Sequence, residues 1–209
     1  LKSHIGRRER IMLHNLFCTP VDEVKIRDTN FIESVYDLYM DCKKNNYFKN
    51  NWMPDNDTCP TTFKHSDNIL RDNNYATKYI ENNCANYLDN LNINFSEIKL
   101  YMSWFNKQTK DQLVGTHDHR DFNKNSISGV YYVKSINDEK QGTIVFLTNN
   151  PFNIEFPYIT NNKEYRDSVA FRAIQNTMMF FPSTLPHKVT VNETDHERVV
   201  LSFNLRFTI

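Results

Sequence analysis

The 209-residue chain has no net charge, no long apolar run and few cysteines. Its 25 basic and 25 acidic side chains cancel, so no global field draws it to nucleic acid or to an anionic membrane. No stretch approaches the roughly 20 apolar residues of a membrane helix, and the N-terminus lacks the apolar segment of a signal peptide. The length suits one domain with one substantial core, and we expect it in the cytoplasm.

Cysteine and glycine are both scarce, with four of each. Cys18, Cys42, Cys59 and Cys84 are scattered and form no CxxC pair, which argues against a zinc–thiolate site and favours a reduced protein. Few glycines beside many asparagines fit an AT-rich genome, such as those of many bacteriophages. We interpret residues 1–11 as a leader or a tag remnant, and residues 12–209 as one domain.

The two halves of this domain differ in hydrophobic period. Between Thr29 and Leu91, apolar residues recur every three or four positions, which predicts two amphipathic helices with a proline-containing loop between them. A short strand is expected near Leu16. From residue 96 the period is two, and about eight short strands follow, separated by asparagine-rich turns. The pattern predicts a mainly β fold, a jelly roll over residues 96–209 that is supported by helices in residues 12–95.

Three histidines stand at spacings typical of a metal site. His117 and His119 are two residues apart, and residues i and i+2 of a strand share a face about 6.6 Å apart. His187 follows much later, and Arg198 lies 11 residues beyond it. The layout indicates a mononuclear iron site with an anion-binding arginine behind it. Asp121 also follows His119 at i+2, so His119 and Asp121 form an alternative pair.

The last predicted strand has one apolar and one polar face. Val199, Leu201, Phe203 and Leu205 alternate with a set that carries polar groups: Arg198, Val200, Ser202 and Asn204. An arginine inside a sheet needs a partner, and a carboxylate is its preferred match. A diacid ligand would satisfy both Arg198 and Ser202.

These residues resemble the iron(II)/2-oxoglutarate-dependent oxygenase superfamily, in its prolyl-hydroxylase-like bacterial and phage branch. That branch reads roughly W-x-N, HxH, SGVYYV, G-x-x-x-F, FPS-x-x-x-H and R-x-x-x-S-F-N. The matching residues run in order from Trp104 to Asn204: Trp104 and Asn106, His117 and His119, Ser128–Val133, Gly142 and Phe146, Phe181–Ser183 with His187, and Arg198 with Ser202–Asn204.

The resemblance implies a double-stranded β-helix that holds iron(II) through His117, His119 and His187. It also implies 2-oxoglutarate as cosubstrate, with its distal carboxylate on Arg198 and Ser202 and with O2 as oxidant. Tyr132, Ser128 and Asn106 are further candidates for the cosubstrate pocket. Trp104 fits core packing better than recognition. The branch departs from the usual superfamily triad, where Asp or Glu stands in place of His119, so Asp121 remains an alternative second ligand.

The implied reaction is hydroxylation of a protein, peptide or small molecule, with release of succinate and CO2. The neutral charge and the lack of a basic, aromatic stripe argue against nucleic acid as substrate. The prime substrate would be selected by loops around the mouth, at residues 108–116, 120–125 and 149–166. Two other classes remain open, a non-catalytic jelly-roll binding protein and a cupin-type three-histidine dioxygenase that uses no keto acid.

Overall fold

The computed structural model describes residues 19–50, 59–119, 126–147 and 168–209. The predicted leader, the strand expected near Leu16, Asp121 and two of the three expected mouth loops lie outside these ranges. The described residues form two helices and nine strands. In chain order these are β1 (Asp22–Lys25), α1 (Thr29–Lys44), α2 (Asn74–Asn90), β2 (Glu97–Gln108), β3 (Val114–His117), β4 (Ser126–Lys134), β5 (Ile144–Leu147), β6 (Ser168–Phe171), β7 (Thr177–Pro182), β8 (His187–Val189) and β9 (Arg198–Thr208).

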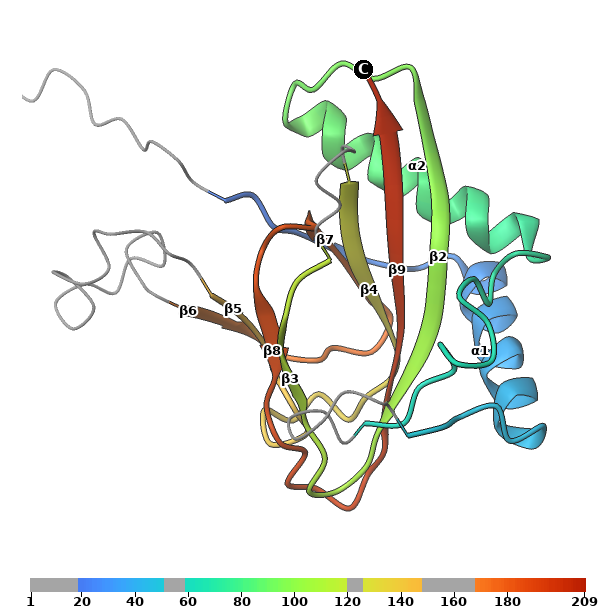
Figure 1. Cartoon of the computed structure of the whole chain (residues 1–209), viewed down its shortest axis with the longest axis vertical. Coiled ribbons are helices and arrows are strands. Elements are labelled where there is room, and N and C mark those ends of the chain that lie inside the picture. The colour runs from blue at the N-terminus through green and yellow to red at the C-terminus, as the bar shows by residue number, and fades with distance from the viewer. Residues whose placement is uncertain (1–18, 51–58, 120–125, 148–167) are drawn as a thin grey trace, which may run out of the picture.

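Both helices begin at a side-chain cap. The carboxylate of Asp28 accepts a hydrogen bond from the Phe31 backbone amide at 2.8 Å, and Asn73 accepts one from the Ala76 amide at 3.0 Å. Each cap satisfies an amide that the first turn leaves without a partner. The two helices lie on the outer face of the larger sheet (Figure 1), as support for the β domain.

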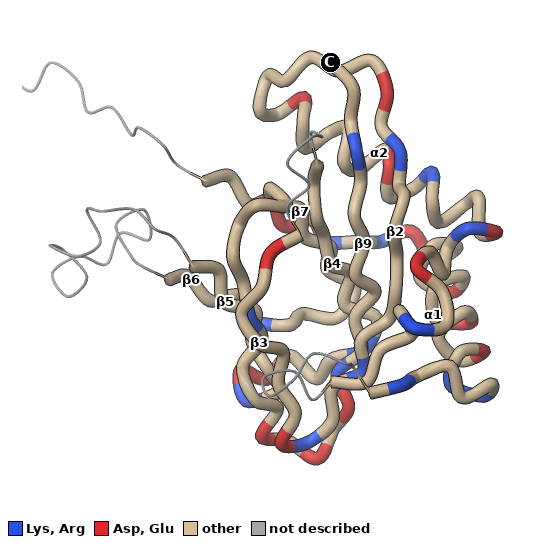
Figure 2. Tube along the Cα trace, viewed as in Figure 1, with Lys and Arg blue, Asp and Glu red and all other residues tan. Residues whose placement is uncertain are grey.

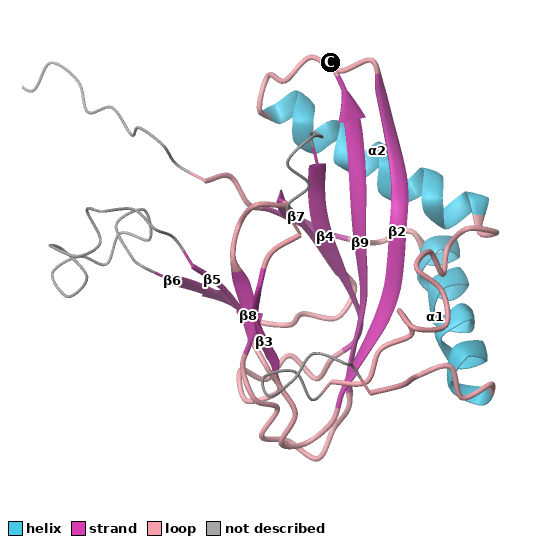
Figure 3. Ribbon diagram, viewed as in Figure 1, coloured by secondary structure: helices cyan, strands magenta, loops and turns pink. Residues whose placement is uncertain are grey.

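The strands form two antiparallel sheets (Figure 3). The larger has the order β1-β7-β4-β9-β2, and the smaller has the order β3-β8-β5-β6. Chain neighbours such as β7 and β8 lie in different sheets, as in a jelly roll. The predicted fold class, a mainly β double-stranded β-helix with N-terminal helices, is confirmed.

The alternation predicted for β9 separates two hydrophobic cores. Val199, Leu201, Phe203 and Leu205 join the core between the large sheet and the helices, whereas Val200 belongs to the core between the two sheets. Strand β4 divides in the same way. Tyr131 packs edge-on against Phe31 of α1, and Tyr132 faces the space between the sheets. The polar face of β9 therefore points into the jelly roll.

Charges of both signs are interspersed along the chain (Figure 2). Cys42, Cys59 and Cys84 are all buried. Among the described helices, neither has the length and apolarity needed to cross a bilayer.

One charged cluster ties α1 to the large sheet. Glu197 accepts hydrogen bonds from Tyr39 and Lys43 of α1 at 2.8 and 3.2 Å, and from Lys134 of β4 at 2.7 Å. Burial opposes ionisation of Glu197, but the three donors outweigh it and lower the pKa of its carboxyl to about 2.

We expect Glu197→Gln to lower the free energy of unfolding by roughly 1 kcal/mol at neutral pH, because it removes charge-assisted hydrogen bonds. A carboxyl whose pKa falls from 4.5 to about 2 on folding stabilises the protein above pH 4.5 and loses that contribution as the pH falls toward 2. Urea unfolding at several pH values measures the difference. The control Glu139→Gln breaks an exposed ion pair with Arg172 and should change little. Equal effects of the two variants would contradict the prediction.

Candidate active site

The smaller sheet brings the three histidines together. His117 ends β3 and lies directly opposite His187, the first residue of β8. Residues paired across two antiparallel strands project from the same face. His119 follows two residues after His117, and its backbone amide donates to the carbonyl oxygen of Ser183 at 2.9 Å. This hydrogen bond holds the segment after β3 beside the turn that precedes β8.

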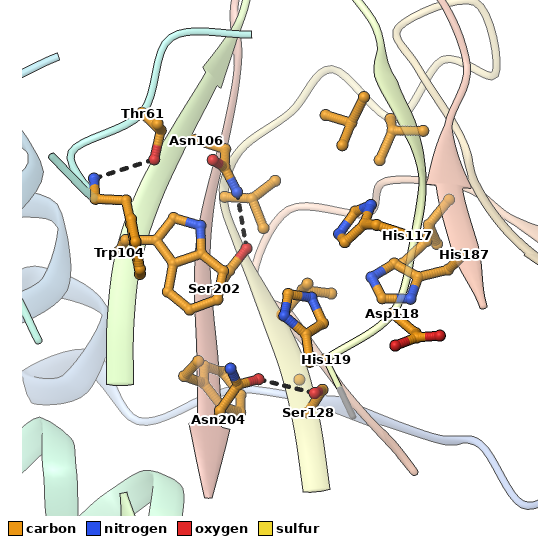
Figure 4. A pocket seen from close by; sticks show the side chains of 18 of the residues that line it. Thr61, Trp104, Asn106, His117, Asp118, His119, Ser128, His187, Ser202 and Asn204 are labelled. Carbon is orange, nitrogen blue, oxygen red and sulfur yellow. Dashed lines mark hydrogen bonds between the residues drawn. The ribbon is translucent and has the colours of Figure 1, made fainter. Parts of the chain in front are cut away.

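The imidazole rings converge on one point (Figure 4). One ring nitrogen from each histidine forms a set whose members all lie within 4.8 Å of one another. The ring centroids are 4.9 Å apart for His117 and His119, 4.4 Å for His117 and His187, and 5.3 Å for His119 and His187. Three imidazoles on one side of a point form a facial set of nitrogen donors, which suits zinc, copper, iron or nickel.

Two of the rings have a defined tautomer. Nδ1 of His117 lies 2.8 Å from the carbonyl oxygen of Gly115, and Nδ1 of His187 lies 2.9 Å from that of Leu185. A carbonyl oxygen only accepts, so each Nδ1 carries the proton. The lone pair then sits on Nε2 of both rings, as a metal ligand requires.

Burial keeps two of the three imidazoles uncharged, those of His119 and His187. Burial and the neighbouring His117 and His187 lower the pKa of His119 to about 3. Burial and His117 lower the pKa of His187 to about 4, against an upward influence of the Leu185 carbonyl. Both imidazoles are therefore neutral near pH 7, the state in which a histidine binds a metal.

The histidines open onto a cavity of about 380 Å³ between the two sheets, within the usual size of small-molecule sites. Figure 4 shows them across the cavity from side chains of the large sheet. The wall combines aromatic, aliphatic, amide and hydroxyl groups. It includes Thr61, Phe63, Met102, Trp104, Asn106, Val114, Asp118, Ser128, Val130, Ile144, Phe181, Val189, Arg198, Val200, Ser202 and Asn204.

Arg198 lies in this wall, and its positive charge has no acidic partner among the described residues. Arg198 is 3% exposed, and its Nε has no hydrogen-bond partner among the described residues. Its guanidinium donates from Nη1 to Oε1 of Gln108 at a long 3.5 Å, hydrogen-bonds the side chain of Tyr132, and lies 5.2 Å from the centre of the Tyr132 ring. Burying a guanidinium without an acid is costly, so the site is suited to an anion.

Of the other residues predicted for the cosubstrate pocket, three line the cavity and one lies behind its wall. Asn106 and Ser202 both line the cavity, and the Asn106 amide donates to the Ser202 hydroxyl at 2.9 Å. Ser128 also lines it. Tyr132 is fully buried beside Arg198 and is not among the lining residues; its hydroxyl donates to the sulfur of Met179 at 3.7 Å. Asp121 lies outside the described residues.

Sequence reasoning missed a polar cluster on the floor of the cavity. The Ser128 hydroxyl donates to the Asn204 side-chain oxygen at 2.8 Å and lies 2.8 Å from the Ser183 hydroxyl. Because a hydroxyl has one proton, Ser183 must be the donor to Ser128. Ser183 stood only in the FPS motif, whereas Asn204 stood in the SFN motif and on the predicted polar face of the last strand, and neither signal indicated that the two would join Ser128.

The expectation that Trp104 serves packing was incomplete, because Trp104 also lines the cavity. Its ring lies 5.7 Å from that of His119 and 5.4 Å from that of Phe63, measured between centroids. Phe63 and Thr61 come from the loop before α2. A loop without periodicity offered no signal that they would reach the cavity.

Several solved structures share this fold. A prolyl-4-hydroxylase of Pseudomonas putida matches with a TM-score of 0.62 and 8% identity, covering 91% of this chain and 92% of its own. The α-ketoglutarate-dependent epimerase SnoN of nogalamycin biosynthesis matches with a TM-score of 0.65 and 11% identity, over 90% and 76% of the two chains. HygX of Streptomyces hygroscopicus, solved with nickel and 2-oxoglutarate, has a TM-score of 0.60 and 12% identity, over 90% and 83%.

No curated protein sequence matches the chain. The family model described as "Putative 2OG-Fe(II) oxygenase" matches residues 102–204, which span the three histidines, Arg198 and most of the cavity wall. Iron(II) and 2-oxoglutarate are the cofactor and cosubstrate that this family implies. The chain therefore belongs to the 2OG-Fe(II) oxygenase family.

Proposed function

We propose that His117, His119 and His187 bind one iron(II) ion and that Arg198 binds the distal carboxylate of 2-oxoglutarate. The observation that carries this proposal is a buried arginine with no described acid partner, in the same cavity as three converging imidazoles. A dicarboxylic keto acid has one end that can chelate a metal and another that can neutralise the guanidinium.

The described residues fit both groups. The three imidazole nitrogens would hold a metal ion from one side of the cavity and would leave coordination positions for exogenous ligands. Three imidazoles also leave the double positive charge of iron(II) uncompensated, so an anionic ligand is favoured there too. Asp121 remains an alternative second metal ligand, in place of His117 or His119.

With O2, bound iron(II) and 2-oxoglutarate would supply the chemistry of hydroxylation, in which one oxygen atom of O2 enters a substrate C–H bond and the other enters succinate, with release of CO2. The chain's own residues orient and shield these groups. The Gly115 and Leu185 carbonyls fix the ring tautomers, and Val130, Ile144 and Val200 form an apolar wall that excludes water from the charged ends.

We place the prime substrate on the side of the cavity formed by Trp104 and Phe63. The Trp104 ring lies near His119, the Phe63 ring packs against Trp104, and the same cavity wall carries the polar side chains of Asn106 and Thr61. Such a surface suits a protein, peptide or small-molecule substrate that is largely uncharged. The alternative function, a cupin-type dioxygenase that uses no keto acid, would not require a buried arginine such as Arg198 in the cavity wall.

We expect His119→Ala and His187→Ala each to abolish the visible charge-transfer band that forms when iron(II) and 2-oxoglutarate are added without oxygen. Each change removes one of three nitrogen donors from the metal. Absorption spectra of anaerobic titrations provide the measurement, and succinate release on admitting oxygen provides a second.

The matched controls are Asp118→Ala, which changes the residue between two proposed ligands, and Asp121→Ala. Both variants should keep the band. Loss of the band in Asp121→Ala with its persistence in His117→Ala would assign the ligands to His119, Asp121 and His187. A wild-type protein without the band would refute the proposed function.

Arg198→Ala should weaken 2-oxoglutarate binding at least about 30-fold, because it removes a buried charge that pairs with a carboxylate, a loss of about 2 kcal/mol or more. Calorimetry on the anaerobic iron(II) protein measures the dissociation constant. Iron(II) affinity itself should remain within about twofold. An unchanged 2-oxoglutarate affinity would remove Arg198 from the site.

Trp104 should report the occupancy of the metal site by fluorescence. A transition-metal ion quenches a nearby indole, and Trp104 lies within 6 Å of His119. Trp104→Phe should abolish the fluorescence change on cobalt(II) addition, although cobalt(II) still binds by calorimetry. The control Trp52→Phe replaces the other tryptophan of the chain and should retain the quenching. The reverse result would place the metal away from His119.

A further inference from the structure

We propose that Gln108 is a positioning residue that orients Arg198 toward the cavity, and that Gly142 is required because it leaves room for Gln108. The proposal rests on the proposed role of Arg198 toward 2-oxoglutarate. Gln108 is fully buried and is not among the residues that line the cavity, so it would act on the ligand only through Arg198.

The register of the large sheet brings Gln108 and Arg198 together. Gln108 is the last residue of β2 and pairs directly with Arg198, the first residue of β9. Paired residues of neighbouring strands project on the same side, so both side chains point into the jelly roll. Asn192 holds this strand end from outside the sheet, since its side-chain amide donates to the Gln108 carbonyl at 3.3 Å.

The amide of Gln108 has only one orientation available. Its Nε2 donates to the carbonyl oxygens of Gln112 at 2.6 Å and Thr190 at 2.8 Å. Carbonyl oxygens cannot donate, so a flipped amide would set Oε1 against two acceptors. Oε1 is therefore directed toward Nη1 of Arg198, at 3.5 Å. A neutral acceptor aligns the guanidinium without neutralising it and leaves its positive charge available to a ligand.

The close approach of Gln108 also accounts for the glycine at position 142. A Cβ atom at this position would lie 2.5 Å from Oε1 of Gln108, well inside van der Waals contact, and the residue has a φ of +89°. Any larger residue would displace the Gln108 amide from its place beside Arg198. The glycine of the G-x-x-x-F motif thus serves the anion site from behind, although it contacts no ligand.

The test measures the affinities of two keto acids for the anaerobic iron(II) protein by calorimetry. 2-Oxoglutarate has the distal carboxylate, and 2-oxobutyrate lacks it. Gln108→Ala should weaken 2-oxoglutarate binding about 5- to 10-fold, the effect of one hydrogen bond to a charged group. Binding of 2-oxobutyrate should stay within about twofold of wild type, since it does not use Arg198.

Gly142→Ala completes a double-mutant cycle. Alone it should reproduce the selective loss of 2-oxoglutarate affinity, because its methyl group displaces the Gln108 amide. In the Gln108→Ala background it should cause no further loss of 2-oxoglutarate affinity relative to 2-oxobutyrate, because the side chain through which it acts is gone. The strain of an alanine at a φ of +89° is present in both backgrounds and should lower the melting temperature in both. Additive losses in the double variant would refute the link between Gly142 and Gln108.

The structural control is Ser103→Ala on the same strand. Ser103 is buried and hydrogen-bonded to Leu70 and Asn68, on the face of β2 that meets the helices. It should lower the melting temperature but leave the ratio of the two keto-acid affinities unchanged. If Arg198→Ala loses 2-oxoglutarate and Gln108→Ala binds both keto acids as wild type does, the positioning role is refuted and the proposed function stands. If wild type binds no 2-oxoglutarate, the proposed function itself fails.

Discussion

The burial of one positive charge constrains this structure more than any other interaction. Arg198 lies on the inner face of β9, and no described carboxylate offsets its charge. The two nearest acceptors of positive charge are neutral, the Gln108 amide and the face of the Tyr132 ring. Burial of this charge carries an electrostatic cost that an anionic ligand would reduce. The cavity, the polar face of β9 and the Gln108 amide all adjoin this one charge.

The acidic residue that directly precedes Arg198 does not pair with it. Glu197 precedes Arg198 but belongs to the cluster with Lys43, Lys134 and Tyr39 that joins α1 to the sheet. Three donors hold its carboxylate on the outside, so it does not neutralise its neighbour. Two adjacent residues thus point to opposite sides of the sheet: Glu197 contacts the helical side, and Arg198 faces the cavity between the sheets, where we propose that it binds an anion.

Sequence reasoning recovered the elements with periodic or motif signals. The alternation along β9 was sufficient to place Arg198 and Ser202 inside, and the i+2 spacing brought His117 and His119 together. Residue 108 was expected to begin a mouth loop, but Gln108 is the last residue of β2 and Val114–His117 form β3. Its contact with Arg198 depends on which strand pairs with β9 and in which register, and no local pattern contains that information. Phe63 reaches the cavity from a loop, where side-chain direction follows from tertiary packing. Tyr132, expected in the cosubstrate pocket, lies beside Arg198 and is not among the lining residues.

The two ends of the proposed site belong to different sheets. His117 and His187 are supplied by β3 and β8 of the smaller sheet, whereas Arg198 starts β9 of the larger one. In the proposed binding mode, a cosubstrate bound at both ends would bridge the two sheets. The length of its carbon chain would then have to match the distance between them. Sheet separation is set by the packed residues between them, such as Phe146 and Phe181. In the proposed binding mode, the packing of this core would therefore set the distance between the two ends of the cosubstrate.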